Sequence, residues 1–359
     1  MRKKNLKYLH FYENRNFKSQ IKMKNFSSLQ HISHYPVMLD EVLKICNPKN
    51  GGDFIDCTFG YGGYSNAILS YPKTKVIALD RDSQTKKYAE KIKKNYKDRF
   101  SFYNKKFSEM SKNINTKKKF DFIIFDLGIS NMQILNLDRG FSFNSKTSID
   151  MRMGLNLISA NEVINSYSQQ TLNDIIRLFG DEKESFKISK NIINERKKSP
   201  ISSSFDLARI IKKSKKKDFN KKINISTKTF QALRIFVNKE FSELINGLIE
   251  ATKLIKSGGK IIVISFHSLE DKIVKFFFTN YSKNKSKVSR YLPDLSKGST
   301  LFENYKNKIV TPSSEEIIKN NASRSAKLRY ITRCKNDFFY PNDLKKKFIK
   351  YLELENRYV

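Results

Sequence analysis

The stretch FIDCTFGYGGYS, residues 54–65, decides the fold. Its first residues are apolar and lead to Asp56, a pattern typical of the end of a buried parallel strand. Three glycines, Gly60, Gly62 and Gly63, come next, and the sequence then continues as the start of a helix. A doubly wound α/β sheet uses this order of strand, glycine-rich turn and helix to bring its backbone close to a nucleotide-like ligand. The stretch therefore predicts a doubly wound α/β fold with a cofactor loop after its first strand.

The same loop indicates the kind of cofactor. Dinucleotide-binding enzymes carry the pattern G-x-G-x-x-G, and Ser65 occupies the third glycine position here. Asp56 would repel a pyrophosphate group, whereas it suits a ligand with positive charge. S-adenosylmethionine carries an ammonium and a sulfonium group, so the loop favours S-adenosylmethionine over NAD as the cofactor.

Two more acidic residues stand at the ends of predicted strands. The second strand, residues 76–80, ends in Asp80, where a carboxylate can bind both ribose hydroxyls of an adenosine. The fourth strand, residues 120–126, is almost continuously apolar before Asp126, which indicates burial on both faces. Because ligands of open α/β sheets bind outside the carboxyl ends of the strands, we expect Asp56, Asp80 and Asp126 to converge on one crevice.

The alternation of strands and helices stops after the fourth strand. Helical segments follow at about residues 159–166, 169–179, 184–197 and 204–213, and Ser204 is a candidate N-cap for the last of them. We predict a basic, disordered N-terminal extension, a core in two parts, a helical substrate-recognition domain inserted between them, and a C-terminal tail. Their boundaries are residues 1–31 for the extension, 32–134 and 240–335 for the core, 135–239 for the insertion and 336–359 for the tail.

The sequence returns to the core through one long predicted helix, residues 227–255, which Gly258 and Gly259 are expected to end. A polar stripe formed by Gln231, Arg234 and Asn238 runs beside its apolar stripe, and it faces either the crevice, which we favour, or water. The fifth strand, residues 260–266, is followed by His267. This histidine has either a role in the pocket or a structural one.

The composition limits the partners. Lys and Arg number 70 against 35 Asp and Glu, a formal net charge of +35 over 359 residues, which indicates nucleic acid ahead of a membrane surface as partner. AT-rich coding is a second source of the many lysines. The three cysteines and four histidines are too scattered for a disulfide framework or a metal site, and they suit a reducing cytoplasm. No apolar run approaches the 18 residues of a membrane span.

The motifs together resemble one family. They are HYPVMLDE (34–41), DCTFGYGGYS (56–65), ALDRD (78–82), FDLGIS and Gln133 (125–133), LDRGFSF (137–143), DMRM (150–153), FQALRIFVNKE (230–240), GGKIIVISFHSLED (258–271) and SRSAKLR (323–329). This series resembles ribosomal RNA small subunit methyltransferase H over residues 34–334. The resemblance implies a Rossmann-like class I methyltransferase sheet, S-adenosylmethionine as cofactor, and methylation of the N(4) amine of a cytidine in 16S rRNA. The implied partner is 16S rRNA or the small ribosomal subunit, and a homodimer is an open expectation.

The resemblance also implies site residues. Cofactor contacts fall on Gly62, Gly63, Tyr64, Asp80, Phe107, Asp126 and Gln133. By position alone Phe107 is either core or an adenine contact, and the resemblance favours the adenine. Three departures from the family pattern stand out. Tyr64 replaces a histidine, Asn131-Met132 replaces Ser-Pro, and Asn321-Ala322 replaces Pro-Arg.

The chemistry assigns a role to Asp126. The exocyclic amine of cytosine is a poor nucleophile, so the enzyme must align it with the methyl group and accept hydrogen bonds from it as charge develops. We assign this acceptor role to Asp126 as the catalytic residue, together with cofactor contact. The cytidine must leave any stack to reach it. Candidate substrate residues are Phe141, Phe143, Arg152, Arg234, Asn238 and His267.

Two other classes of protein are weighed against this one. A nicotinamide-dependent oxidoreductase conflicts with the missing third glycine and with Asp56. A basic RNA-binding or assembly protein without cofactor conflicts with the intact Asp80, Asp126 and glycines.

Overall fold

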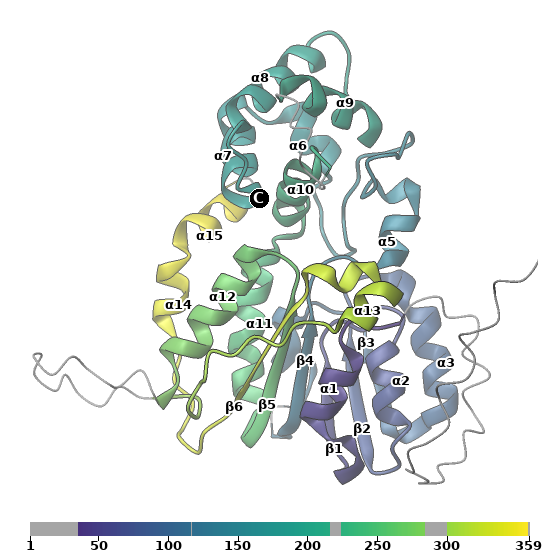
Figure 1. Cartoon of the computed structure of the whole chain (residues 1–359), viewed down its shortest axis with the longest axis vertical. Coiled ribbons are helices and arrows are strands. Elements are labelled where there is room, and N and C mark those ends of the chain that lie inside the picture. Colours follow the sequence, from purple (N-terminus) through teal and green to yellow (C-terminus); the bar gives the residue numbers. More distant parts are fainter. Residues whose placement is uncertain (1–34, 116, 216–223, 284–299, 358–359) are drawn as a thin grey trace, which may run out of the picture. The chain divides into compact units, whose positions relative to one another are not determined.

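The computed structural model describes residues 35–357, apart from 116, 216–223 and 284–299. Its centre is a six-stranded sheet in the order β3-β2-β1-β4-β5-β6 (Figure 1). The strands are β1 (Gly52–Asp56), β2 (Thr74–Leu79), β3 (Phe100–Tyr103), β4 (Phe120–Asp126), β5 (Ile255–Ser265) and β6 (Lys327–Thr332). The first five are parallel and β6 is antiparallel to β5. The doubly wound α/β fold predicted from the sequence is confirmed, while the predicted N-terminal extension lies outside the described residues.

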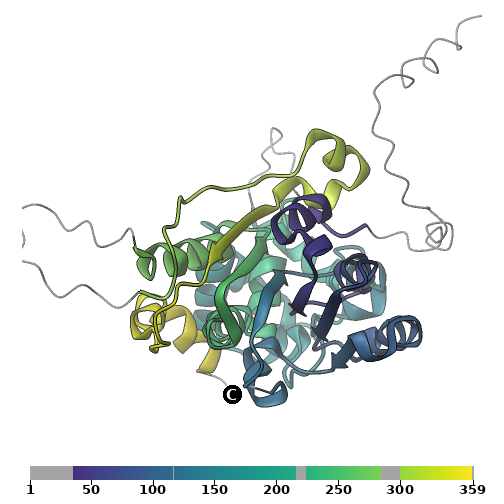
Figure 2. The same cartoon turned by 90° about the horizontal axis from the view of Figure 1, so that it is seen from below.

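Helices cover both faces of the sheet because successive side chains of a strand point to opposite sides (Figure 2). On one face Phe54, Val76 and Ile124 share a buried cluster with the first three helices, and on the other Ile55 and Ile123 share a second cluster with later ones. The first group is α1 (Leu39–Cys46), α2 (Gly63–Leu69) and α3 (Lys86–Tyr96), and the second is α4 (Met110–Asn113), α11 (Glu240–Leu254) and α12 (Ser268–Asn280). Burial on both faces explains the continuous apolar runs of the central strands.

The strand order reverses between β1 and β4, and this point positions the site. From β1 the chain continues to β2 and β3 on one side, whereas β4 and β5 lie on the other. The amide of Cys57 donates to the carbonyl of Ile124, so the two strands stay paired up to their carboxyl ends. Asp56 and Asp126 therefore end neighbouring strands at the place where open α/β sheets bind ligands.

Helices α5 (Asn131–Leu135), α6 (Ala160–Ser166), α7 (Gln169–Gly180), α8 (Ser185–Arg196), α9 (Ser204–Ser214) and α10 (Thr227–Asn238) follow β4 (Figure 1). The N-cap of α9 is Ser203, whose hydroxyl accepts from the amide of Asp206, and not Ser204 as predicted. Ser204 is already helical, and its hydroxyl donates to the carbonyl of Gly140. Among the described residues no helix has the length and apolar character that a membrane span needs.

The long helix predicted over residues 227–255 is two helices, α10 and α11. Lys239 separates them with a left-handed backbone, φ 49°, which turns the chain between Asn238 and Glu240. The predicted helix end at Gly258 and Gly259 is also wrong, because α11 ends at Leu254 and both glycines belong to β5. Gly258, with its left-handed backbone, lies where the register between β4 and β5 shifts, so the strand continues past it. The periodicity of the sequence does not reveal such a shift.

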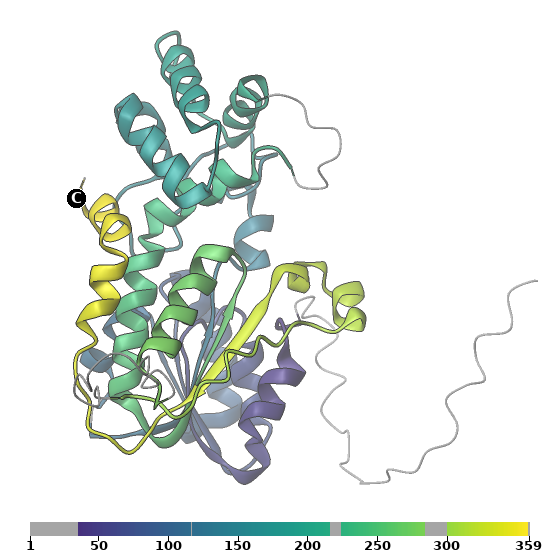
Figure 3. The same cartoon turned by 60° about the vertical axis from the view of Figure 1, so that its left-hand side comes forward.

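The C-terminal segment, predicted as a tail, forms two packed helices. They are α14 (Asn342–Lys347) and α15 (Ile349–Asn356), and the preceding segment contains the short helix α13 (Ser314–Lys319). Leu344, Phe348 and Leu354 are buried in the same cluster as α11 and α12. In Figure 3, α15 runs beside α11 and reaches the helices that follow β4.

The antiparallel edge strand is tied to the sheet by a buried charge. Arg329 of β6 is 3% exposed, and its guanidinium donates to both carboxylate oxygens of Asp271 on α12, at 2.6 and 3.1 Å. The same guanidinium donates to the hydroxyl of Tyr305 and to the side chain of Asn307. A buried pair of this kind is expensive to break, because the remaining charge stays away from water.

We therefore expect Asp271→Asn to lower the free energy of unfolding by roughly 3 kcal/mol, since it leaves Arg329 without a counter-ion. Chemical denaturation with a fluorescence readout measures the change. Glu195→Gln is the control, because it removes an exposed pair with Lys198 and should change the free energy of unfolding far less. Equal losses in the two variants would contradict the assignment of β6 anchoring to the Asp271 pair.

Candidate functional site

Asp56, at the end of β1, is buried and used by the fold. The hydroxyl of Ser65 donates to Asp56 Oδ2 at 2.6 Å and the amide of Thr58 donates to Oδ1 at 3.3 Å, and no part of the residue is exposed. Burial raises the pKa of Asp56 to about 6, against the lowering effect of these hydrogen bonds. The carboxylate shapes the turn between β1 and α2, so it adds negative charge to the strand ends without facing a ligand.

The three glycines of the turn have different reasons to be glycine. A Cβ on Gly62 would lie 2.5 Å from Ile92 Cδ1, and one on Gly63 would lie 2.3 Å from Pro36 Cγ. A Cβ on Gly60, whose φ is +55°, would meet nothing within 4 Å. Gly62 and Gly63 are thus required by packing within the chain, whereas Gly60 borders open space. The contact of Gly62 and Gly63 with a cofactor stays a prediction.

Asp80 follows β2 and faces Gly60. Its Oδ2 accepts from the amide of Gly60 at 2.7 Å and its Oδ1 accepts from the amide of Asp82 at 2.8 Å. Burial is the main cause that raises its pKa to about 6, and the charges of Asp82 and Asp56 add to it. The residue is only partly buried, and each carboxylate oxygen keeps a second lone pair. These lone pairs are free to accept two hydroxyl groups, as the sequence predicts for a ribose.

Asp126 ends β4 with one oxygen unsatisfied. Its amide donates to Thr58 Oγ1 at 2.7 Å, which fixes the backbone, while Oδ1 is buried and has no hydrogen-bond partner among the described residues. Burial, followed by the charges of Asp56, Glu270 and Glu316, raises the pKa of Asp126 well above its usual value. A buried acceptor without a donor costs free energy unless a ligand supplies one. Asp126, like Asp80, therefore has hydrogen-bonding capacity left for a ligand.

Asp82 organises the loop beside these acids, although the sequence analysis did not single it out. Its Oδ2 accepts from Gln133 Nε2 at 2.9 Å and pairs with Arg139, and Arg139 also donates to the carbonyl of Arg152. Gln133 uses its other amide atom on the backbone of Ser130. The predicted cofactor residue Gln133 is thus buried and engaged within the chain. The ALDRD motif could have indicated this role of Asp82, because Asp82 is the second acid after the strand.

Tyr64 and Phe107 lie on different sides of the sheet. Tyr64 is buried, and its hydroxyl donates to the carbonyl of Val37, so the ring that replaces the family histidine packs under α1. Phe107 is partly exposed, with its ring 5.3 Å from that of Phe125 and packed against Gly247 of α11. The exposed part of the Phe107 ring leaves room for the predicted contact with an adenine, which stays a prediction.

The predicted substrate residues before α6 are mostly committed to internal contacts. Phe141 is buried under the guanidinium of Arg139, 5.7 Å from its ring centroid. Phe143 packs edge-on against Phe230 at 4.7 Å. Arg152 pairs with both oxygens of Asp150, and its side chain remains 38% exposed.

The predicted polar stripe of α10 faces the interior. Asn238 is fully buried, and its amide donates to the carbonyls of Met151 and Arg234 and accepts from Met153 and Asn156. These contacts use the hydrogen-bonding capacity of the side chain. In this structure the amide of Asn238 holds the 151–156 loop, and a substrate contact of Asn238 stays a prediction.

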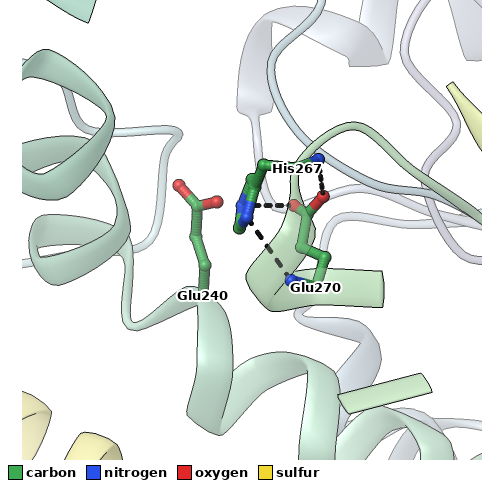
Figure 4. A group of neighbouring side chains, drawn as sticks. All are labelled: Glu240, His267 and Glu270. Atoms are coloured by element: carbon green, nitrogen blue, oxygen red, sulfur yellow. Dashed lines mark hydrogen bonds and ion pairs between the residues drawn. The ribbon is translucent and has the colours of Figure 1, made fainter. Parts of the chain in front are cut away.

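Glu240, His267 and Glu270 lie close together (Figure 4), and Arg234 joins this charged cluster through its pair with Glu240. Arg234 binds both oxygens of Glu240, at 2.8 and 2.9 Å, and Gln231 turns away to the carbonyl of Phe179. His267 caps α12, since its Nδ1 accepts from the amide of Glu270, while Nε2 lies 3.1 Å from Glu270 Oε1.

Glu240, His267 and Glu270 offer ligand atoms within 4.8 Å of one another, so they form a geometric candidate for a metal ion that the sequence did not predict. Two contacts oppose it. Both oxygens of Glu240 are paired with Arg234, and an acceptor Nδ1 places the proton of a neutral imidazole on Nε2, the atom a metal would need. The cluster holds two charged pairs beside Asp126, and the charges of His267 and Arg234 lower the pKa of Glu270 against the effect of burial.

A mostly parallel, doubly wound α/β sheet with a buried acid at a strand end is the arrangement of a protein that binds a ligand at the carboxyl edge of its sheet. Residues 31–334 match the model of the MraW methylase family. Ribosomal RNA small subunit methyltransferase H of Ehrlichia canis is 42% identical over 84% of this chain and 99% of that protein, and the enzyme of that name from Rickettsia massiliae is 44% identical over 83% and 97%. A solved rRNA methylase structure from Streptococcus thermophilus aligns with a TM-score of 0.36 at 8% identity, over 82% of this chain and 96% of that one.

The chain belongs to the MraW methylase family. The family spans the core strands and the helices between β4 and β5, and it ends before α14 and α15.

The packing roles of the glycines can be tested by adding one methyl group. Gly63→Ala should lower the free energy of unfolding by roughly 1–3 kcal/mol, because its Cβ collides with Pro36. Gly60→Ala is the matched variant in the same loop, where only the left-handed backbone opposes the change, at about 1 kcal/mol. Denaturant unfolding of both variants measures the difference. A larger loss for Gly60→Ala would contradict the packing role of Gly63.

The raised pKa of Asp56 predicts a pH dependence. Because the folded pKa of about 6 exceeds the ordinary 3.8, the stability that this group contributes is present at low pH and is lost as the pH rises through 6. The unfolding free energy of the wild type minus that of Asp56→Asn should therefore fall between pH 4 and 7, by at most about 3 kcal/mol. A flat profile for Asp56→Asn would show that the buried carboxyl is not perturbed.

Proposed function

We propose that this chain transfers the methyl group of S-adenosylmethionine to the N(4) amine of a cytidine in 16S rRNA. Membership of the MraW methylase family supports methyl transfer, and the small subunit rRNA named for the relatives supports the substrate. The observation that carries the proposal is the buried Oδ1 of Asp126 at the reversal point of the sheet, which has no hydrogen-bond partner in the part of the chain that the structure describes. An amino group of the substrate is the donor that this oxygen lacks.

The described residues fit S-adenosylmethionine. Asp80 would hold the ribose hydroxyls with its free lone pairs, Gly60 leaves space for the approach, and Phe107 would lie against the adenine. Gly62, Gly63 and Tyr64 shape this loop from behind, and Gln133 does so through Asp82. When bound, the cofactor supplies an electrophilic methyl group on a sulfonium ion. The carboxylates of Asp56, Asp80 and Asp126 give the strand ends the negative charge that suits this cation.

Asp126 would act on the cytosine amine directly. Its free oxygen accepts a hydrogen bond from N(4)–H, which draws electron density onto the nitrogen and fixes its lone pair toward the methyl group. As the N–C bond forms, the amine becomes more acidic and can pass its proton to the same oxygen. Burial, followed by the negative charges of Asp56 and Glu270, raises the pKa of Asp126, which favours this transfer.

The cluster of Arg234, Glu240, His267 and Glu270 would support the acceptor from the side. Glu270 is buried and ionised, and His267 and the amide of Phe266 hold it in place. Its charge acts on Asp126, so we assign His267 a positioning role, while direct contact of His267 with the base stays a prediction. Phe143 and Arg152 remain candidates for substrate contact at the surface, and Phe141 supports the loop beneath them.

The net charge of +35 supports a long polyanionic substrate, with helices α6–α10 as the part that grips it. Whether the substrate is free 16S rRNA or the assembled small subunit, and whether the chain acts as a homodimer in the cytoplasm, stay predictions. Mass spectrometry of nucleosides from 16S rRNA treated with the protein and labelled S-adenosylmethionine tests the function. The expected product is labelled N(4)-methylcytidine, and label in another nucleoside or none at all would refute the proposal.

Asp126→Asn should fold and bind the cofactor but transfer methyl groups at least about a hundredfold more slowly, because the amide presents a donor and cannot take the proton. Single-turnover transfer to rRNA and calorimetric titration with S-adenosylmethionine measure the two properties. Glu250→Gln is the control, since this acid lies on α11 away from the strand ends and pairs with Lys253. A wild-type rate for Asp126→Asn would remove Asp126 from the mechanism.

A further inference from the structure

The C-terminal helices lie beyond the segment that the family shares. The family match ends at residue 334, whereas α14 and α15 continue to residue 356. Helix α15 packs against both α7 and α11 (Figure 3). The ring of Tyr351 lies 5.2 Å from that of Phe241 on α11 and 6.1 Å from that of Phe179 on α7. This helix therefore connects the helices that follow β4 to the core.

Glu355 of α15 caps the start of α11. Its carboxylate accepts from the amides of Phe241 and Ser242, at 3.0 and 2.8 Å, and from the hydroxyl of Ser242. It is only 1% exposed. The first amides of a helix need acceptors from outside the helix, and Lys239, which precedes α11, offers no side-chain acceptor. The cap comes from a segment more than a hundred residues away in sequence.

The capped turn is also the joint between α10 and α11. Lys239 turns the chain there with its left-handed backbone, and Glu240 in the capped turn binds Arg234 of α10 across the bend. Just before the bend, Asn238 holds the 151–156 loop, and its carbonyl accepts from Arg81 next to Asp80, at 2.8 Å. The direction of the first turn of α11 thus sets how α10 and this loop meet the strand ends.

We propose that Glu355 is a positioning residue for RNA methylation. By capping α11 it fixes the joint at Lys239, and through Glu240 and Asn238 it aligns α10 and the 151–156 loop with Asp80 and Asp126. Glu355 touches neither the cofactor nor the reacting atoms, so its effect is on alignment of the substrate-gripping helices. The inference rests on the proposed function of those helices, and it gives a segment outside the family match a part in the reaction.

The test uses the full chain with Glu355→Ala, Glu355→Gln and Leu344→Ala. Leu344 is a buried residue of α14 and does not cap α11, so it is the matched control for lost packing. Glu355→Ala should bind S-adenosylmethionine within about twofold of the wild type, yet its single-turnover rate on saturating rRNA should fall about tenfold. Glu355→Gln keeps one acceptor oxygen, so its single-turnover rate should lie between those of the wild type and Glu355→Ala. Leu344→Ala should lose stability but keep the rate well below its melting temperature.

Two readouts report the joint without the substrate. Amide hydrogen exchange of Phe241 and Ser242 should be faster in Glu355→Ala than in Leu344→Ala, because only the first removes their acceptor. Spin labels on the exposed Lys94 of α3 and Lys190 of α8 should give a broader distance distribution in Glu355→Ala.

Three results would overturn the proposal: unchanged exchange, an unchanged distance distribution, or equal loss of rate in Glu355→Ala and Leu344→Ala. Inactive wild-type protein with altered exchange in Glu355→Ala would instead refute the proposed function and leave Glu355 as the residue that fixes the joint.

Discussion

The turn after β2 is the constraint on which the site depends, because three consecutive charged residues each bind a different part of the chain. Asp80 accepts from the glycine loop, Arg81 binds the carbonyl of Asn238 and the carboxylate of Glu243, and Asp82 holds Gln133 and Arg139. These charges are largely buried, and a buried charge is tolerated only when it is paired or well hydrogen-bonded. Each partner therefore stays in place, because moving it away would leave a buried charge without a hydrogen-bond or ion-pair partner, which is unfavourable. The turn brings together a loop from β1, the α10–α11 joint and the segment after β4.

The charge distribution separates two tasks. The chain as a whole is strongly basic, a charge that favours association with a polyanion such as the proposed RNA. The ends of β1, β2 and β4 carry acids whose pKa values are raised by burial, and the charge of Asp56 raises those of Asp80 and Asp126 further. Such a cluster repels phosphate and favours a cation. A cationic methyl donor and an anionic RNA can thus approach neighbouring regions of one protein without competing for the same charges.

The sequence was sufficient for the sheet and for its acids. A parallel strand buried on both faces leaves a continuous apolar run, and an acid directly after such a run has few places to lie except the carboxyl edge of the sheet. Asp80 and Asp126 were located in this way. The reasons for Gly62 and Gly63 could not be found, because the atoms that exclude a Cβ come from Pro36 and Ile92, which are distant in sequence.

The break between α10 and α11 could not be predicted from the sequence for a related reason. The apolar stripe continues through Lys239 without a change of period, and lysine is not a residue that normally marks a left-handed turn. The bend is held by tertiary contacts, namely Asn238 with the 151–156 loop and Glu355 with the first turn of α11. Polar residues beside an apolar stripe can face a cleft, water or another loop, and periodicity does not separate these cases.

The same contacts change how the helices after β4 should be understood. By sequence they form an insertion with clear ends, but Phe179, Phe236 and Phe241 belong to one buried cluster that continues from these helices into the core. Removing residues 155–225 would expose the apolar face of α10 and strip Phe179 from Phe241. Loss of RNA methylation in such a deletion would then follow from a damaged core as readily as from a lost RNA grip. Since the joint at Lys239 and its cap are built from single side chains, point variants there separate alignment from folding, which a deletion cannot do.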